Sequence, residues 1–103
     1  MEVRVARLPE VPPGTGLAVY AGGVDIALFN LDGEIVAIGS ECPHQSGSLG
    51  DGQLDGEIVT CPLHGWEFDA RTGGCMTVPG ELVPRFPVRV DGDAIVVELP
   101  DPA

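Results

Sequence analysis

The sequence contains no lysine, and its five basic residues are all arginines. Sixteen acidic residues outnumber them, so the formal net charge at pH 7 is −11. A protein that binds nucleic acid needs a basic face to neutralise phosphates, so this composition argues against a nucleic-acid partner. An acidic surface suits a carrier that is attracted to a partner with basic patches, and it equally suits a surface whose only role is solvation.

The chain also has no apolar run that approaches the ~20 residues of a membrane span. Its first residues, MEVRVARLPE, lack the charged-then-apolar order of a signal peptide. Cysteine is scarce and odd in number, at three, which without an export signal predicts metal or redox use rather than a disulfide framework. We therefore expect a cytoplasmic protein that does not associate with membranes.

Long helical stretches are missing as well, because fifteen glycines and ten prolines interrupt the chain. Short β-branched runs separated by turns are present instead, among them EVRVARL, LAVYAG and GEIVTC. Asp-Gly turns between apolar runs predict two hairpins. Their paired segments are 24–30 with 34–39, and 86–90 with 94–99. We predict an all-β fold, a small antiparallel sandwich or barrel that forms one domain over residues 1–103.

Both histidines of the chain lie beside cysteines, in the segments CPH and CPLH, which are separated by sixteen residues. The residues concerned are Cys42, His44, Cys61 and His64. Two thiolates and two imidazoles suit zinc in a tetrahedral site or iron in a cluster. Zinc sites usually space their paired ligands about two to four residues apart, whereas one residue separates the first pair here. If each segment gives its Cys to one iron and its His to another, the set matches a 2Fe–2S cluster with two His on one iron.

These residues resemble the signature of the Rieske iron–sulfur family. CPH and CPLH are similar to its Cys-x-His and Cys-x-x-His pairs, and the flanking HQSGSLGDG, GWEFDARTG and VPGELVPRFPVRV also resemble its segments. The resemblance implies a Rieske fold in which two loops form a cluster-binding subdomain over about residues 40–80. It implies one 2Fe–2S cluster held by Cys42, His44, Cys61 and His64. A structural zinc site formed by the same four residues is the alternative.

Comparison within that family implies a low reduction potential. High-potential members carry a disulfide between the two loops, at the positions of Gly47 and Leu63 here. They also carry a Ser and a Tyr that donate hydrogen bonds to cluster sulfurs, at the positions of Trp66 and Phe68. Gly47 and Leu63 cannot form that disulfide, and neither Trp66 nor Phe68 has an O–H to donate. The resemblance therefore implies a reduction potential on the order of −150 mV, at the low end of the Rieske range.

Three residues outside the ligand pairs have simpler interpretations. Cys75, in TGGCMTV, is expected to be a small buried hydrophobic residue rather than a ligand. Trp66 and Phe68 would share one face of a strand and belong to the core or cover the cluster. Arg71 belongs to a predicted turn, from which it could form a salt bridge with an acidic strand.

No further catalytic machinery accompanies the candidate cluster. A mononuclear iron site needs two His and a carboxylate, and the cluster would use both His of the chain. No Gly-rich dinucleotide fingerprint follows a predicted strand. The chain therefore resembles a stand-alone Rieske ferredoxin, a monomer that is not an enzyme by itself. Such a protein carries one electron from a flavin-dependent NAD(P)H reductase to a terminal aromatic-ring-hydroxylating oxygenase.

Two other functions stay open. The CPHQ and CPLHGWEFD segments also resemble the small subunit of NADH-dependent nitrite reductase. A zinc-stabilised β-domain that only binds a partner is the third hypothesis, and metal analysis would separate it from the other two.

Overall fold

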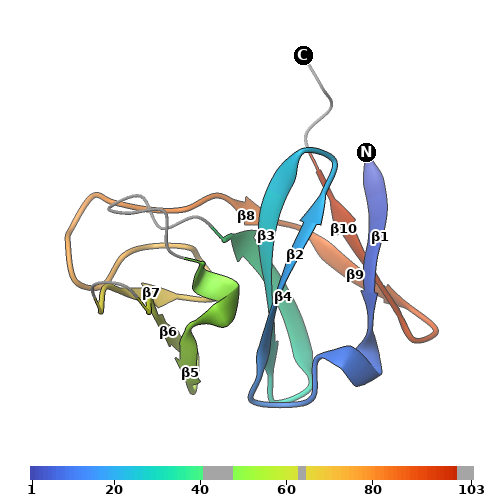
Figure 1. The fold of residues 1–103 in the computed structure, drawn as a ribbon, viewed down its shortest axis with the longest axis horizontal. Coiled ribbons are helices and arrows are strands. Elements are labelled where there is room, and N and C mark those ends of the chain that lie inside the picture. The colour runs from blue at the N-terminus through green and yellow to red at the C-terminus, as the bar shows by residue number, and fades with distance from the viewer. Residues whose placement is uncertain (41–47, 63–64, 100–103) are drawn as a thin grey trace.

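The computed structural model describes residues 1–40, 48–62 and 65–99. In that part of the chain the strands form three antiparallel sheets that lie next to one another (Figure 1). The strands are β1 (Glu2–Arg7), β2 (Gly16–Ala21), β3 (Val24–Leu31), β4 (Glu34–Gly39), β5 (Gln53–Asp55), β6 (Ile58–Thr60), β7 (Glu67–Asp69), β8 (Arg85–Phe86), β9 (Val88–Asp91) and β10 (Ala94–Glu98). The predicted all-β antiparallel architecture is confirmed.

We call these layers the terminal sheet (order β1-β10-β9), the middle sheet (β2-β3-β4-β8) and the short-strand sheet (β5-β6-β7). Two short 3-10 turns, η1 (Leu8–Glu10) and η2 (Leu49–Asp51), are the helical elements of the described residues. None of the helices in the described ranges has the length and apolar character to cross a membrane.

Strand β3 is apolar at consecutive positions because both of its faces are covered. Phe29 packs with residues of the short-strand sheet in one group of buried side chains, which we call the loop-side core. Ile26 and Leu28 pack with residues of the terminal sheet in a second group, which we call the terminal-side core. All three side chains have zero exposed surface. A strand buried on both faces loses the polar–apolar alternation of a half-exposed strand. The loop-side core consists of Ala27, Phe29, Leu31, Ile38, Leu49, Val59, Cys61, Phe68, Ala70 and Val83.

The first predicted hairpin is observed. Strands β3 and β4 pair from Ile26 with Gly39 to Leu31 with Glu34, and the chain reverses at Asp32 and Gly33. Both turn residues have positive φ, at 57° and 101°. This combination is typical of a type I′ turn, whose twist matches that of the strands it connects.

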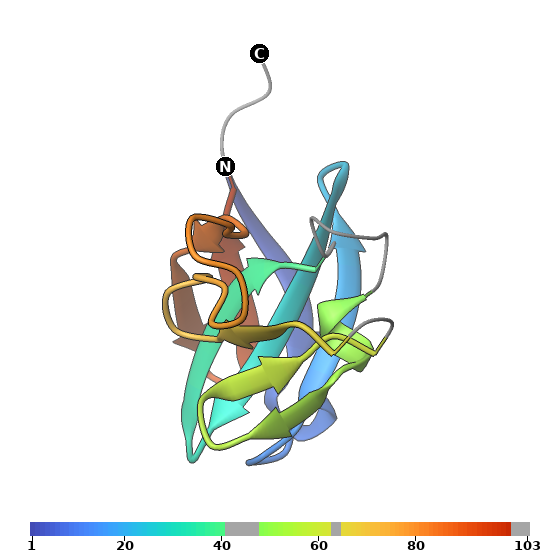
Figure 2. The same ribbon diagram turned by 90° about the vertical axis from the view of Figure 1, so that its left-hand side faces the viewer.

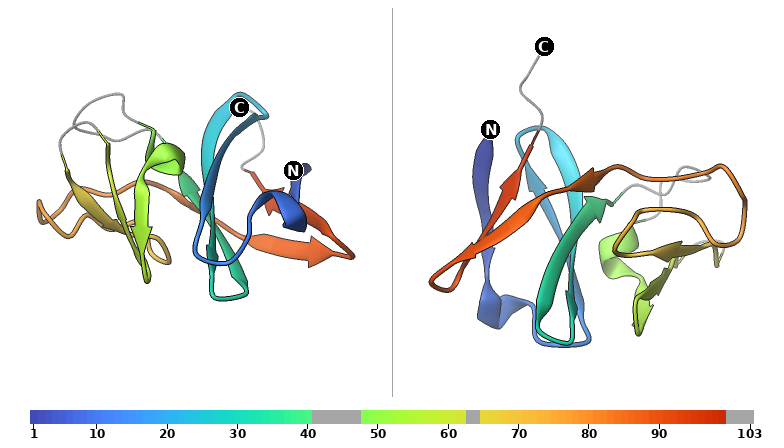
Figure 3. Two further views of the ribbon diagram at one scale, coloured as in Figure 1. Left: turned by 60° about the horizontal axis from the view of Figure 1, so that its bottom comes forward. Right: turned by 180° about the vertical axis from the view of Figure 1, so that it is seen from behind.

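The second predicted hairpin is correct at its turn and wrong at its beginning. Strand β9 pairs with β10 around Gly92 and Asp93, but Phe86 belongs to β8 and pairs with Ala37 of the middle sheet. Pro87 separates β8 from β9. Because proline has no N–H to donate, it interrupts the ladder at the point where the chain passes from the middle sheet to the terminal sheet (Figure 3).

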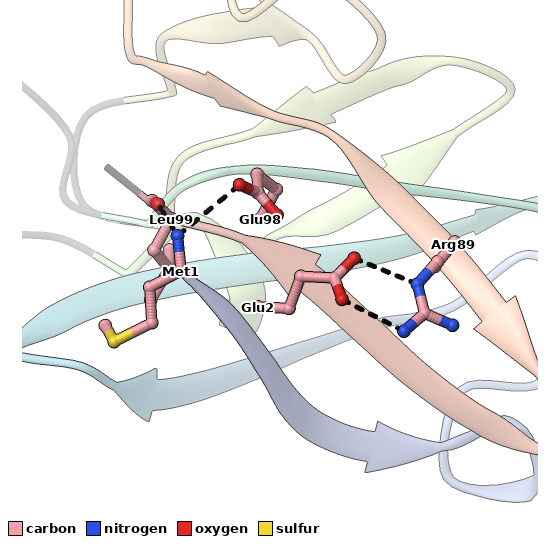
Figure 4. Close-up of polar contacts among 5 residues, drawn as sticks. All are labelled: Met1, Glu2, Arg89, Glu98 and Leu99. Atoms are coloured by element: carbon pink, nitrogen blue, oxygen red, sulfur yellow. Dashed lines mark hydrogen bonds and ion pairs between the residues drawn. The ribbon is translucent and has the colours of Figure 1, made fainter. Parts of the chain in front are cut away.

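Polar contacts join the N-terminal end of the chain to the other two strands of the terminal sheet (Figure 4). The Glu2 carboxylate accepts hydrogen bonds from Nε and Nη2 of Arg89, at 3.0 and 3.1 Å. These hydrogen bonds, and then the charge of the guanidinium, lower the pKa of Glu2, and the same hydrogen bonds, and then the charge of the carboxylate, raise the pKa of Arg89. The amino group of Met1 donates to the carbonyl of Leu99 at 2.8 Å and lies 3.4 Å from Oε1 of Glu98. The charges of this sheet are thus largely paired.

Gly73 occupies a position that no larger residue can take. Its φ is +81°, and a Cβ at this residue would lie 2.3 Å from the carbonyl oxygen of Val83. Its N–H donates to the backbone carbonyl of Asp69 at 2.7 Å, and its carbonyl accepts from the N–H of Val83 at 2.9 Å. We expect Gly73→Ala to destabilise the protein by ~2–4 kcal/mol, since the positive φ and the backbone clash act together. Thermal unfolding followed by circular dichroism would measure this loss.

Gly14 provides the matched control, because its φ is also +81° but, beyond its chain neighbours, no atom in the described part of the chain lies within 4 Å of the position of a Cβ. Gly14→Ala should therefore lower the free energy of unfolding by only about 1 kcal/mol, which is the cost of the positive φ. This corresponds to a decrease of roughly 4–8 °C in Tm for a domain of this size. Equal shifts in the two variants would show that the contact between Gly73 and Val83 does not limit the packing.

Candidate metal centre

Cys61 directly follows β6, where the second predicted ligand segment begins. Its thiol is free and its side chain is 1% exposed, within the loop-side core beside Val59 and Phe68. A thiolate in apolar surroundings is costly unless a cation compensates its charge. The position therefore fits a ligand of a metal or iron–sulfur centre, in which the metal supplies that compensation.

Two backbone hydrogen bonds connect Cys61 to the residues that follow the second predicted ligand segment. The N–H of Cys61 donates to the carbonyl of Trp66 at 2.7 Å, and the N–H of Gly65 donates to the carbonyl of Cys61 at 3.1 Å. Gly65 has a φ of +73°, and no atom of the described residues beyond its chain neighbours lies within 4 Å of the position of a Cβ. Glycine is favoured here by its backbone conformation rather than by close packing.

Serines anchor the chain on both sides of the first predicted ligand segment. The carbonyl of Ser40 accepts from the N–H of Leu49 at 2.7 Å, and the hydroxyl oxygens of Ser40 and Ser48 lie 3.1 Å apart. The N–H of Gly50 also donates to the hydroxyl of Ser40, at 3.2 Å. These contacts hold the end of β4 against η2.

The chain that follows this first segment lies against the strand that leads to the second. A Cβ on Gly52 would lie 2.3 Å from the carbonyl oxygen of Thr60, and Leu49 shares the loop-side core with Cys61. A Cβ on Gly50 would likewise lie 2.6 Å from Cα of Ala18, so η2 sits directly on β2. Both ligand segments therefore begin from one compact region at the edge of the short-strand sheet.

Of the four predicted ligands, the structure describes Cys61. Cys42, His44 and His64 lie outside the described residues, as do Gly47 and Leu63. Among the residues that are described, no three His, Cys, Asp or Glu side chains are gathered as a metal site. Phe68 is fully buried and Trp66 packs against the same core, as expected for this pair.

Cys75 corrects an expectation, because it is half-buried rather than buried. Its residue bridges to Phe68 at the edge of β7 and packs against the loop-side core. Its Sγ accepts a hydrogen bond from the N–H of Val78 at 3.3 Å. A residue that lies at a sheet edge keeps one side open to the following loop, which explains the partial exposure.

Arg71 confirms the expected turn and salt bridge and adds a second one. Its Nη1 lies 2.7 Å from Oε2 of Glu34, and its Nε pairs with Oε1 of Glu57. The backbone N–H of Arg71 donates to Oδ1 of Asp69 at 2.8 Å. The guanidinium thus joins the β3–β4 turn to the β5–β6 turn and holds the short-strand sheet to the middle sheet. The sequence did not indicate with which two of the sixteen acidic residues Arg71 would form salt bridges.

Comparison with known families identifies the class of this protein. Residues 1–87 match the model of the Rieske [2Fe-2S] domain family, so the chain belongs to that family. A Rieske-type 2Fe–2S cluster is therefore its cofactor. The buried free thiol of Cys61, directly after strand β6, fits one ligand of such a cluster.

Similar proteins narrow the class to ferredoxins. The chain is 34% identical over 98 residues to the ferredoxin component of the naphthalene 1,2-dioxygenase system of Pseudomonas aeruginosa, with 94% of each chain covered. It is 37% identical to the biphenyl dioxygenase ferredoxin subunit of Pseudomonas sp. strain KKS102, over 93% of this chain and 90% of the other. The ferredoxin of carbazole 1,9a-dioxygenase from Nocardioides aromaticivorans IC177 superimposes with a TM-score of 0.86 at 34% identity, covering 94% and 96% of the two chains. The chain is an electron-transfer protein and not an enzyme by itself.

Two further solved structures concern the choice of partner. The ferredoxin in a complex with the reduced oxygenase of carbazole 1,9a-dioxygenase has a TM-score of 0.85 and 28% identity, over 93% of this chain and 91% of the other. A protein described as an NADH-dependent nitrite reductase small subunit from Mycobacterium tuberculosis has the same TM-score and identity, over 94% and 93%. The fold therefore does not separate the two functions, whereas the curated relatives favour the ferredoxins.

Proposed function

We propose that this chain is a low-potential Rieske ferredoxin that carries one electron from a flavin-dependent NAD(P)H reductase to a terminal aromatic-ring-hydroxylating oxygenase. It would act in the cytoplasm as a single-domain monomer, with the cluster-binding subdomain at about residues 40–80. The observation that carries this proposal is the buried, free Cys61 at the end of β6, in a chain similar over almost its full length to oxygenase ferredoxins. Its negative charge suits brief docking that depends on salt.

Cys42, His44, Cys61 and His64 form the proposed ligand set. The two Cys would bind one iron and the two His the other, and a cluster bound in this way takes up and releases one electron. The surroundings of Cys61 in the described part of the chain are compatible with that arrangement. Cys61 shares the loop-side core with Phe68 and Val59 and is 1% exposed, and its N–H is bound to the carbonyl of Trp66.

The local hydrogen bonding supports a low reduction potential. Phe68 has no O–H to donate, and the N–H of Cys61 is already bound to the carbonyl of Trp66. Fewer donors to the sulfurs leave the reduced state less stabilised, so its potential is lower. We expect a midpoint on the order of −150 mV in a redox titration followed by EPR. A midpoint above about +100 mV, well inside the high-potential part of the Rieske range, would contradict this proposal.

Metal counting and EPR on one anaerobic sample separate the three candidate functions. The ferredoxin should contain two irons per chain and give a rhombic EPR signal after reduction by dithionite, as expected for a Rieske cluster. One zinc and no signal would indicate the zinc-stabilised β-domain instead. Recovery of the native protein in a complex with a sirohaem subunit, rather than with an oxygenase, would favour the nitrite reductase function.

A further inference from the structure

The outer face of the short-strand sheet is not covered by any other described element. Leu54, Val59 and Phe68 point inward and pack in or against the loop-side core. Successive residues of a strand point to opposite faces, so the residues between them point outward. The strand register aligns these outward residues in two rows across the sheet. Figure 2 shows the molecule from the side on which this sheet lies. One row is Gln53–Thr60–Glu67, and the other is Asp55–Ile58–Asp69.

A groove of about 480 Å³ lies on this outer face, and its lining consists of Gln53, Leu54, Asp55, Ile58, Thr60, Glu67 and Met76. Ile58 lies in the groove, and Met76, with 61% of its surface exposed, lines its border. The N–H of Met76 donates to the carbonyl of Glu67 at 2.7 Å, which fixes the loop along the edge of β7. Asp55 and Glu67 supply the negative charge. Among the described residues, no arginine forms an ion pair with either of these two carboxylates.

Charge is distributed unevenly between the two ends of the molecule. Within the described residues from 48 to 83, six acidic residues oppose one arginine, and that arginine already pairs with Glu34 and Glu57. The six are Asp51, Asp55, Glu57, Glu67, Asp69 and Glu81. The strands of the terminal sheet carry three acidic residues and three arginines. A basic partner is therefore attracted to the end that contains Cys61 and the groove, and not to the other end.

We propose that the groove on β5, β6 and β7 is a docking surface for a basic redox partner. An arginine or lysine of the partner would lie between Asp55 and Glu67, and an apolar side chain beside it would cover Ile58 and Met76. Thr60 and Glu67 are adjacent in sequence to Cys61 and Trp66, so docking here brings the partner next to the predicted ligand Cys61. A second copy of the chain does not fit, since two acidic grooves repel each other.

The inference rests on the proposed electron-transfer function, and a double variant with a matched control tests it. Asp55→Asn combined with Glu67→Gln removes two charges from the groove. Glu10→Gln combined with Asp91→Asn removes two charges from η1 and β9, which are not part of the short-strand sheet. Both double variants change the net charge from −11 to −9 and keep polar side chains of the same size. Cytochrome c, a basic haem protein, serves as the probe, and stopped-flow absorbance measures its reduction by each reduced ferredoxin.

At low ionic strength the groove variant should react roughly 5-fold more slowly than the wild type, and the control by less than about 2-fold, because steering depends on local charge. The difference should disappear near 1 M salt, where the Debye length is about 3 Å. Met76→Gln should slow the reaction by about 2-fold at both salt concentrations, since burial of an apolar side chain is not screened. Equal slowing in the two charge variants would overturn the proposal, because only net charge would then matter.

The same samples distinguish failure of docking from failure of the proposed function. A protein without a reducible 2Fe–2S cluster would contradict the proposed function, and docking would still be measured by carbodiimide cross-linking to oxidised cytochrome c. Cross-links at Asp55 and Glu67 support the groove. Cross-links confined to acidic residues of the terminal sheet, or a reduced ferredoxin that does not react with cytochrome c, overturn it.

Discussion

Replacing Cys61 with serine is expected to reduce bound iron from two atoms per chain to almost none, whereas Cys75→Ser should leave the iron content unchanged. Cys61 is 1% exposed and directly follows β6, while Cys75 is half-buried and its sulfur accepts a hydrogen bond from the N–H of Val78. A serine hydroxyl is not ionised at neutral pH and is a harder ligand than a thiolate. Loss of a direct ligand should exceed the roughly 10–100-fold loss of metal affinity seen when only an outer-shell partner is removed.

Iron analysis and the visible spectrum of the two purified variants would measure this difference. Circular dichroism of each protein tests whether the strands have formed, because Cys61 also belongs to the loop-side core. A folded Cys61→Ser protein with full iron would remove Cys61 from the ligand set. A folded Cys75→Ser protein without iron would instead make Cys75 a ligand, and the Rieske spacing would then not describe this site.

The sequence predicted those parts of the fold that depend on neighbouring residues. The Asp-Gly turn and the apolar runs on either side predicted the β3–β4 hairpin, because turn type and register are determined within a few residues. The second hairpin failed at Phe86, since an apolar residue before a proline fits either of two sheets equally well. Its pairing with Ala37 joins segments about fifty residues apart, and no local pattern encodes that choice.

Long-range contacts limited prediction of the site in the same way. The spacing of Cys and His predicted the ligand segments, since two pairs of ligands on short turns are what a cluster with Cys and His ligands requires. The sequence did not show that the N–H of Cys61 is bound to Trp66, or that Arg71 joins two turns. It also gave no sign of the groove, because the register of three strands brings Gln53, Thr60 and Glu67 into one row.

Replacing His64 with cysteine is expected to lower the reduction potential by on the order of 100 mV while two irons remain bound. Two His in place of two Cys raise the potential of a 2Fe–2S centre from roughly −400 mV to about −150 mV or above. A single thiolate in place of a neutral imidazole should reverse part of that difference, because its negative charge makes the ferrous state harder to form. A redox titration of the variant and the wild type, followed by EPR, measures the change.

The proper control for His64→Cys is Cys75→Ser, which alters a thiol outside the two ligand segments and should leave the potential unchanged. A spectrum that shifts toward that of an all-cysteine cluster would show that the new thiolate binds the reducible iron. If the potential stayed within ~30 mV of the wild type, less than the 59 mV of a tenfold change for one electron, His64 would not be a ligand. The imidazole on that iron would then have to come from elsewhere, and His44 is the one other histidine in the chain. The proposed set of two Cys and two His would no longer hold.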